Sequence, residues 1–332
     1  MEAASGKLSS APTRTRQSRW ARGEGKSAQI TERDLRYLEV LYDNGPTRAN
    51  LLHAMVCPGV TQKVTTVRLR KLHRLPNAYV DRPARQRESY NANYSFLVYE
   101  ISKKGEQLLA ERGRVTEENR VWRANTNRGR YLAFWHEVLI ADVMGSIRLG
   151  IAKDPCLRLV TWAEILQRAP AATRALKFPL SMHFRMASTI NGTQIETKVT
   201  PDALFGLEYT TEGKKSYRFF ALEADRATEP IRRASFKGSS YHKKIEQYRE
   251  LVKQEVYRTQ LGIPNLFVLT VTTGENHMRN IMSFLEELVG RSSLFLFKSV
   301  RESFEEATEP SPNILEVPWA RVGHELFRID EP

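Results

Sequence analysis

Apolar residues recur at helical spacing in three segments near the start of the chain. The first helix is expected to begin at Thr31, where Thr-Glu-Arg-Asp has the form of a capping box. A second is expected to begin at Thr47 and to end at Pro58-Gly59, and a third covers residues 61–75. Two strands and another helix follow, at 78–82, at 94–101 and from Ser102.

The third of these helices has an apolar face and a basic face. Its inward face is expected to consist of Val64, Val67 or Arg68, Leu69, Leu72 and Leu75. Its outward face then carries Lys63, Thr66, Arg70, Lys71 and Arg74, and no acidic residue occurs in this helix. Three helices followed by a two-stranded ribbon predict a winged helix-turn-helix, in which the third helix enters the major groove. Arg85 and Arg87 at the ribbon tip would then contact phosphate.

In the second half of the chain, helical and strand patterns alternate. Helices are expected at 131–149, 163–168, 240–257 and 277–289, and strands at 157–162, 200–208, 216–225, 265–273 and 294–297. This order predicts a mixed central sheet and an α+β protein of two domains.

The patterns divide the chain into five parts. These are a disordered basic arm at 1–29, a winged helix DNA-binding domain at 30–111, a linker at 112–130, an α/β domain at 131–300 and an acidic C-terminal segment at 301–332. The arm also has the composition of a mitochondrial transit peptide, which is the disfavoured interpretation.

Charge and composition narrow the class of function. The 332 residues include 51 Lys and Arg against 38 Asp and Glu, a formal charge of +13, so nucleic acid is the leading partner. Two cysteines are too few for a disulfide framework, and no apolar run is long enough to cross a membrane. A cytoplasmic protein with no membrane association is therefore expected. No Walker A motif or nucleophile triad supports an ATPase or hydrolase.

Carboxylates gather on two neighbouring predicted strands. Asp202 lies on the first, and Glu223 and Asp225 lie on one face of the second because side chains alternate along a strand. Glu137 is expected to reach them from a packed helix. Such oxygen ligands are what Mg²⁺ or Mn²⁺ needs to clamp a phosphodiester and activate water, with Asp202, Glu223 and Asp225 as the candidate metal ligands. No other cofactor is indicated.

These motifs resemble the PD-(D/E)XK nuclease-like superfamily, in which a Pro-Asp strand precedes a strand ending in Glu-x-Lys. More narrowly, the chain resembles the replication-relaxation family of plasmids and mobile elements over about residues 31–260. The motifs that carry this resemblance are Val160-Thr-Trp-Ala-Glu164, Pro201-Asp202-Ala203, Glu223-Ala-Asp-Arg-Ala-Thr-Glu229 and Lys243-Lys-Ile-Glu-Gln-Tyr248, behind a winged helix. The resemblance implies a nuclease-like α/β domain.

The chain departs from the nuclease pattern at Asp225, which stands where a nuclease has lysine. The candidates to replace that lysine are Lys243 and Lys244 on the next helix and Lys237 in the loop before it. A DNA-binding scaffold whose carboxylates hold an ion or an arginine network is therefore favoured over metal-dependent cleavage.

Two residues near these carboxylates, His136 and Glu137, have alternative roles. His136 as a general base is a weaker interpretation than a metal-activated water. Glu137 has a purely structural alternative, in which it pairs with Arg226 or Arg233.

The favoured function is a DNA-binding accessory protein for replication, nicking-complex assembly or mobilisation of a plasmid or mobile element. Double-stranded DNA is its expected partner, together with a relaxase or a replication initiator protein. The main alternative is a Mg²⁺-dependent endonuclease with Asp202, Glu223 and Glu137 as its catalytic residues, assisted by Lys243 or Lys244. A second alternative is a winged-helix transcriptional regulator. The sequence leaves the DNA site and the oligomeric state open.

Overall fold

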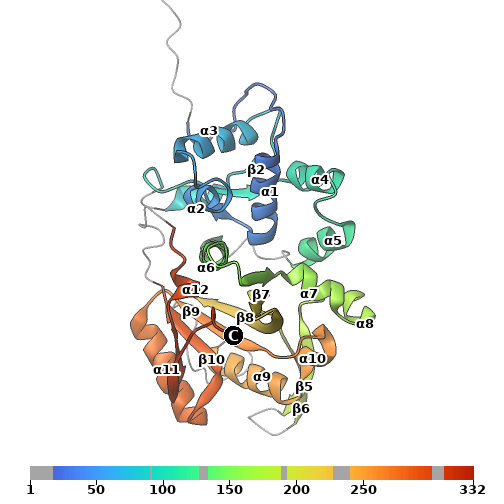
Figure 1. Ribbon diagram of the computed structural model, residues 1–332, viewed down its shortest axis with the longest axis vertical. Helices are drawn as coiled ribbons and strands as arrows, with labels where there is room; N and C mark the ends of the chain where they lie inside the picture. The colour runs from blue at the N-terminus through green and yellow to red at the C-terminus, as the bar shows by residue number, and fades with distance from the viewer. Residues whose placement is uncertain (1–17, 90–91, 127–133, 188–192, 227–239, 301–309) are drawn as a thin grey trace, which may run out of the picture.

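The computed structural model describes residues 18–89, 92–126, 134–187, 193–226, 240–300 and 310–332. An N-terminal unit of helices and short strands lies against helix α6, and α6 in turn covers one face of a seven-stranded mixed sheet (Figure 1). The α+β class and the mixed central sheet predicted from the sequence are confirmed.

The helices among the described residues are interspersed with strands along the chain. They are α1 Glu32–Asn44, α2 Ala49–Val56, α3 Gln62–His73, the 3₁₀ turn η1 Ala84–Glu88, α4 Lys103–Glu111, α5 Glu117–Thr126, α6 Phe134–Ile151, α7 Trp162–Arg168, α8 Ala171–Arg174, α9 Tyr241–Lys253, α10 Val256–Leu261, α11 Glu275–Val289 and α12 Asn313–Glu316. The strands are β1 Thr47–Arg48, β2 Val80–Asp81, β3 Val98–Ile101, β4 Leu157–Val160, β5 Met182–Ala187, β6 Gln194–Val199, β7 Ala203–Thr211, β8 Lys214–Asp225, β9 Phe267–Thr272, β10 Ser292–Ser299, β11 Trp319–Val322 and β12 His324–Phe327.

The N-terminal unit has the order of elements expected of a winged helix. Thr31 caps α1 in a capping box with Asp34, as the sequence predicts, and Gly45 ends that helix at a positive φ of 80°. Thr47 does not cap α2, because it lies in the short strand β1, and Arg48 takes the N-cap position. Strand β1 pairs with β3, which pairs with β2, so the ribbon has three strands.

The inward face of α3 differs from the prediction. The helix buries Thr65, Leu69, Leu72 and His73, whereas Val64, Val67 and Leu75 are exposed. Arg68 lies at the edge of the buried face, where Asp34 accepts a hydrogen bond from its Nε at 2.6 Å. The buried face differs from the predicted one because the hydroxyls of Thr65 and Tyr37 of α1 are hydrogen-bonded at 2.8 Å, and this contact sets the rotation of the helix.

Residues 18–29 pack against the N-terminal unit and are not part of a disordered arm. Backbone bonds join Gly25 to the carbonyl of Leu75 and Leu75 to the carbonyl of Gly23, at 2.7 and 3.1 Å. The side-chain amide of Asn77 bonds to the backbone of Lys26 and Ala28. The rest of the predicted arm, residues 1–17, lies outside the described residues.

His73 of α3 is 4% exposed, and its Nδ1 has no hydrogen-bond partner. Burial lowers the pKa of His73 to about 3, with Arg82, Arg22 and Arg74 adding repulsion. In the unfolded chain, His73 therefore binds a proton below about pH 6.5. In the folded chain it does so only below about pH 3, so between these values protonation favours the unfolded state. The stability present above pH 6.5 is lost progressively as the pH falls through this window.

We expect the free energy of unfolding to fall by about 2 kcal/mol between pH 7 and pH 5 because of His73 alone. Urea titrations at the two pH values measure the loss, and His73→Leu should reduce it by that amount. The control is His324→Gln on exposed β12, which should lose as much stability as the wild type. An unchanged loss in His73→Leu would contradict the assignment.

The strands of the large sheet follow the order β12-β11-β10-β9-β8-β7-β4. Strands β8, β9 and β10 are parallel neighbours, and the remaining pairs are antiparallel. Across the first parallel pair, Glu223 lies opposite Thr270 and Asp225 lies opposite Thr272. The carboxyl ends of these strands therefore meet at one edge of the sheet, beside the start of β7.

Helices cover both faces of this sheet. On one face, α9, α10 and α11 pack on residues that include Phe219, Ala221 and Val268. On the other face, α6 and α12 pack on residues that include Phe220, Leu222 and Leu269. The alternation along β8 thus sends neighbouring side chains into two separate apolar clusters.

The acidic C-terminal segment is partly a component of the core. Helix α12 buries Ile314 and Leu315 beneath α6, and β11 and β12 extend the sheet. Trp319 is fully buried and donates from Nε1 to the carbonyl of Ile314 at 3.0 Å. The large domain therefore continues to about Ile329, beyond the boundary expected at 300.

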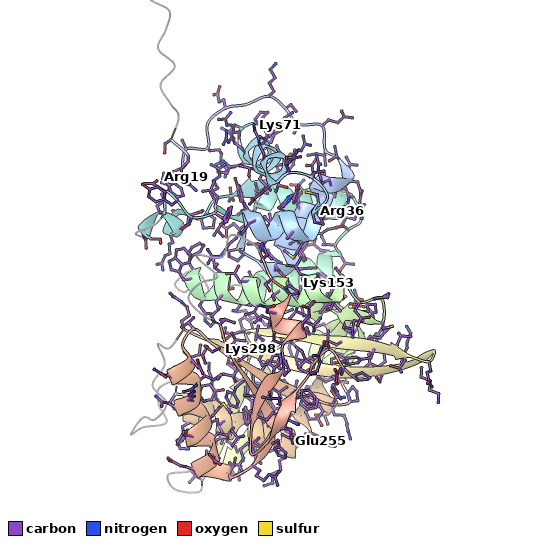
Figure 2. The ribbon with its side chains drawn as sticks, turned by 60° about the vertical axis from the view of Figure 1, so that its left-hand side comes forward. Arg19, Arg36, Lys71, Lys153, Glu255 and Lys298 are labelled. Carbon is purple, nitrogen blue, oxygen red and sulfur yellow. The ribbon has the colours of Figure 1, made fainter. Side chains whose placement is uncertain are left out.

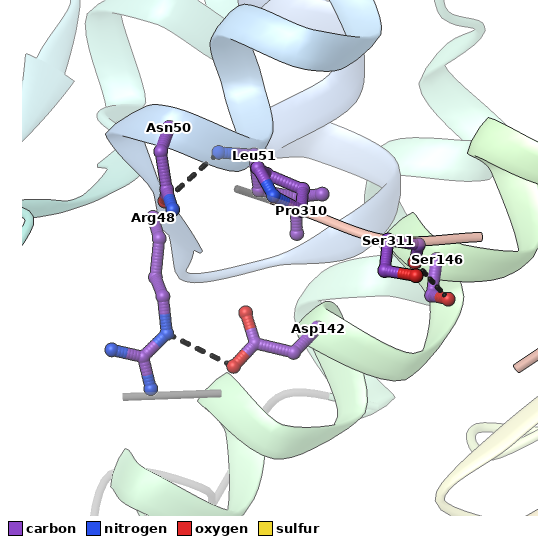
Figure 3. Close-up of a pocket in the computed structure, with 7 residues that line it drawn as sticks. All are labelled: Arg48, Asn50, Leu51, Asp142, Ser146, Pro310 and Ser311. Atoms are coloured by element: carbon purple, nitrogen blue, oxygen red, sulfur yellow. Dashed lines mark hydrogen bonds and ion pairs between the residues drawn. The ribbon is translucent and has the colours of Figure 1, made fainter. Parts of the chain in front are cut away.

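Helix α6 is buried on both sides because it also supports the N-terminal unit. Arg48 and Asp142 form an ion pair of 3.0 Å with side chains only 6% and 4% exposed (Figure 3). Gly145 lets Leu51 approach, since an added Cβ would lie 2.5 Å from the Leu51 Cδ2 atom. The two parts of the protein are therefore joined by a packed interface.

No helix among the described residues is both long enough and apolar enough to cross a membrane.

Candidate functional site

The predicted carboxylates meet at the sheet edge defined by the ends of β8 and β9. Asp202 precedes β7 and is fixed there by two bonds: its backbone N–H donates to the Leu222 carbonyl, and its Oδ2 accepts from the backbone N–H of Ala224 at 2.9 Å. Glu223 and Asp225 lie on the same face of β8 and are 5% and 4% exposed. The sequence prediction placed these three residues together for the reason that holds here, strand alternation.

Glu223 is paired with a lysine from the following helix. Ser240 begins α9 by accepting from the backbone N–H of Lys243, and the helix turns Tyr241, Ile245 and Tyr248 into the core. Lys244 reaches Glu223 with Nζ 3.0 Å from Oε2.

Tyr248 occupies the other carboxylate oxygen of Glu223, donating from its hydroxyl to Oε1 at 2.6 Å. Burial raises the pKa of Glu223, and Lys244 opposes that rise. Both carboxylate oxygens therefore have protein partners.

Asp202 is paired with a histidine from the opposite face of the sheet. His136 of α6 lies with Nε2 3.0 Å from the Asp202 Oδ1 atom. Burial opposes ionisation of both groups, but the His136 contact holds the pKa of Asp202 below its usual range and Asp202 raises that of His136. With its Nε2 atom engaged by Asp202, His136 is not the free base that a hydrolytic mechanism requires.

Asp225 is paired with a histidine that the sequence analysis missed. His277, in the first turn of α11, lies with Nε2 2.8 Å from the Asp225 Oδ2 atom. The other oxygen, Oδ1, is buried without a hydrogen-bond partner. No local signal connects residues 52 positions apart; only the parallel crossover from β8 to β9 brings the start of α11 to this edge.

The carboxylates do not fit a metal ion as they lie. Among the residues that the structure describes, no group of three or more His, Cys, Asp and Glu is placed to hold one. Asp202 and Glu223 already use both oxygens in contacts with His136, Lys244, Tyr248 and the backbone. The predicted Mg²⁺ or Mn²⁺ site stays a prediction without support from this geometry.

The remaining predicted catalytic residues are partly accounted for. Glu137 is half-buried on α6 beside His136, whose pKa it helps to raise. Lys243 is adjacent to Lys244 in α9, and the salt bridge described above is made by Lys244. Lys237 and Arg233 lie outside the described residues.

The predicted DNA-contacting residues lie on the N-terminal unit. Lys63 and Arg70 are exposed on α3, whereas Thr66, Lys71 and Arg74 are half-buried. Figure 2 shows Lys71 on the part of this unit that is far from the sheet, with Arg19 at one side of it.

The ribbon tip and the ordered part of the arm carry further cations. Arg85 and Arg87 are exposed in η1, and the Arg87 guanidinium lies 5.7 Å from the ring centre of Trp20. Arg19 lies over the same ring at 4.9 Å. The arm thereby adds its charge beside the ribbon, a contact that the sequence analysis did not predict.

These observations define a class: an α+β protein with a basic N-terminal unit built on a mixed sheet that carries a buried acidic cluster at one edge. The replication-relaxation family matches residues 38–266, more than half of the chain, and the protein belongs to that family. The resemblance found in the sequence motifs is thereby confirmed. No curated protein and no solved structure matches the chain.

Proposed function

We propose that this protein is a DNA-binding accessory protein for replication or mobilisation of a plasmid or mobile element. The observation that carries the proposal is the outward face of α3, which presents Lys63 and Arg70 to solvent in a helix without any Asp or Glu. A cationic helix of this kind binds duplex DNA by displacing counterions from phosphates. Family membership supports the replication context.

The full chain is expected to bind duplex DNA with an affinity that falls steeply with salt. Lys63→Ala/Arg70→Ala should weaken binding to a mixed-sequence duplex and lower the slope of log affinity against log salt by about 2, one for each phosphate contact. Fluorescence anisotropy between low and physiological salt measures both quantities.

The matched control is Lys253→Ala/Arg279→Ala, which removes two exposed cations from α9 and α11 of the large domain. This variant lowers the net charge by the same amount but leaves α3 unchanged. It should therefore keep the wild-type salt slope. Equal losses in the two double variants would attribute binding to overall charge and overturn the assignment to α3.

The acidic cluster is proposed to be a scaffold element with no cleavage activity. Each of its carboxylates contacts a side-chain nitrogen of the protein, from His136, Lys244 or His277, at a position that a bound metal ion would otherwise occupy. The large domain would then present a surface to a relaxase or a replication initiator protein while the N-terminal unit holds DNA.

One observation favours the alternative of a metal-dependent endonuclease. Lys244 stands beside Glu223, so the lysine missing at position 225 is supplied from the next helix. Because both oxygens of Asp202 and of Glu223 already have protein partners, we expect neither Mg²⁺ nor Mn²⁺ to raise the melting temperature or to promote plasmid nicking. Mn²⁺-dependent nicking that Asp202→Ala and Glu223→Gln both abolish would establish the endonuclease.

A further inference from the structure

The outward face of α3 is apolar at its centre. Of the large hydrophobic side chains exposed among the described residues, several lie in or beside this one helix: Val60, Val64, Val67 and Leu75. Val67 is 56% exposed, the highest value among these four residues. Valine has a lower helix propensity than Ala or Lys, so folding alone does not favour it at an exposed helical position.

Val67 points directly away from the core. At about 100° per residue, it lies about 200° from Leu69 and 140° from Leu72, the two fully buried leucines of the helix. Lys63 and Lys71 lie one turn before and after it, and Arg70 flanks it on one side. The most exposed apolar side chain of the helix is therefore surrounded by cations.

This combination suits the major groove of duplex DNA. The surrounding cations favour a polyanion, and the major groove, about 8.5 Å deep, has phosphates along its rims and base edges on its floor. On that floor the apolar group of a base pair is the C5-methyl of thymine, which small apolar side chains contact. An acidic protein surface would also attract the cations, but the absence of Asp and Glu from α3 and the replication context of the family favour DNA.

We propose that Val67, with Val64 beside it, contacts the C5-methyl group of a thymine and so makes the protein prefer thymine at one position of its site. The inference rests on the proposed DNA-binding function and adds a specificity-determining residue to it. Lys63 and Arg70 would set affinity through phosphate, while Val67 would discriminate between base pairs.

The test uses deoxyuridine, which pairs as thymine does but lacks the methyl group. A random 30-base-pair duplex pool is selected on the full chain, and the enriched duplex is resynthesised with each thymine in turn replaced by deoxyuridine. At one position of the core, the wild type should bind about three- to fivefold more weakly, the effect of one buried methyl group. Val67→Ala should bind the thymine duplex more weakly by a similar factor and ignore the replacement.

The matched control is Val121→Ala, which changes an equally exposed valine on α5 and should keep the full deoxyuridine effect. Salt-dependent binding without a deoxyuridine effect at any position would overturn the inference and leave the proposed DNA-binding function intact. A Val67→Ala variant that keeps the wild-type deoxyuridine effect would also overturn it. Absence of any DNA binding would overturn both.

Discussion

Asp142→Ala is expected to lower the free energy of unfolding by about 3–5 kcal/mol, because it leaves Arg48 buried without its carboxylate. The pair joins β1 of the N-terminal unit to α6, and the guanidinium also lies 5.9 Å from the ring centre of Trp135. Equilibrium urea denaturation at pH 7 measures the change.

Two further variants separate the ion pair from the packing around it. Arg48→Met/Asp142→Leu removes both charges and should recover most of the lost stability, since no uncompensated ion remains. Lys153→Ala removes one member of an exposed pair, which joins the turn just after α6 to Glu316 of α12, and should cost less than about 1 kcal/mol. A loss in Asp142→Ala no larger than in Lys153→Ala would show that the interface does not depend on the buried pair.

Lys244→Met is expected to destabilise the protein by about 3 kcal/mol at pH 8, because Glu223 loses the cation that compensates its buried charge. Burial already raises the pKa of Glu223 above its unfolded value, so its folded form binds more protons and stability falls as the pH rises above about 4.5. Removing Lys244 raises that pKa further and extends the fall to higher pH. Urea titrations at pH 5 and pH 8 should therefore differ more in the variant than in the wild type.

The control for this prediction is Glu223→Gln/Lys244→Met, which leaves no buried charge at the site. It should recover stability at pH 8 and lose the added pH dependence, while Tyr248 keeps a hydrogen-bond acceptor. A Lys244→Met protein with wild-type stability at both pH values would show that the lysine does not neutralise Glu223. In that case a bound cation becomes the better explanation of the cluster.

Local signals in the sequence predicted most of the elements. The capping box predicted at Thr31 begins α1, and the helix expected at 163–168 matches α7 to within one residue. In helix α3, local signals did not predict correctly which side chains are buried. Periodicity alone does not decide whether the valines Val64 and Val67 face the core together with Leu69 and Leu72. The bonds of Thr65 to Tyr37 and of Arg68 to Asp34 decide it.

At the candidate site, the sequence predicted the carboxylates, whereas the structure was needed to assign their partners. Asp202, Glu223 and Asp225 were found from strand alternation, which is a local rule. The sequence narrowed the lysine near them only to Lys237, Lys243 or Lys244. It missed His277, which is far along the chain. The inward turn of Tyr241 and Tyr248 places Lys244 at the edge of the buried stripe and so against Glu223.

By itself the sequence determined the order of most helices and strands, the basic character of α3 and the presence of an acidic cluster, because these follow from the spacing of neighbouring residues. Only the tertiary structure decided which cation meets each carboxylate, that Trp319 is fully buried, and that Arg48 pairs with Asp142. Those contacts join segments tens of residues or more apart. Their geometry depends on parallel strand pairing and on how α6 packs between two bodies, which no local periodicity encodes.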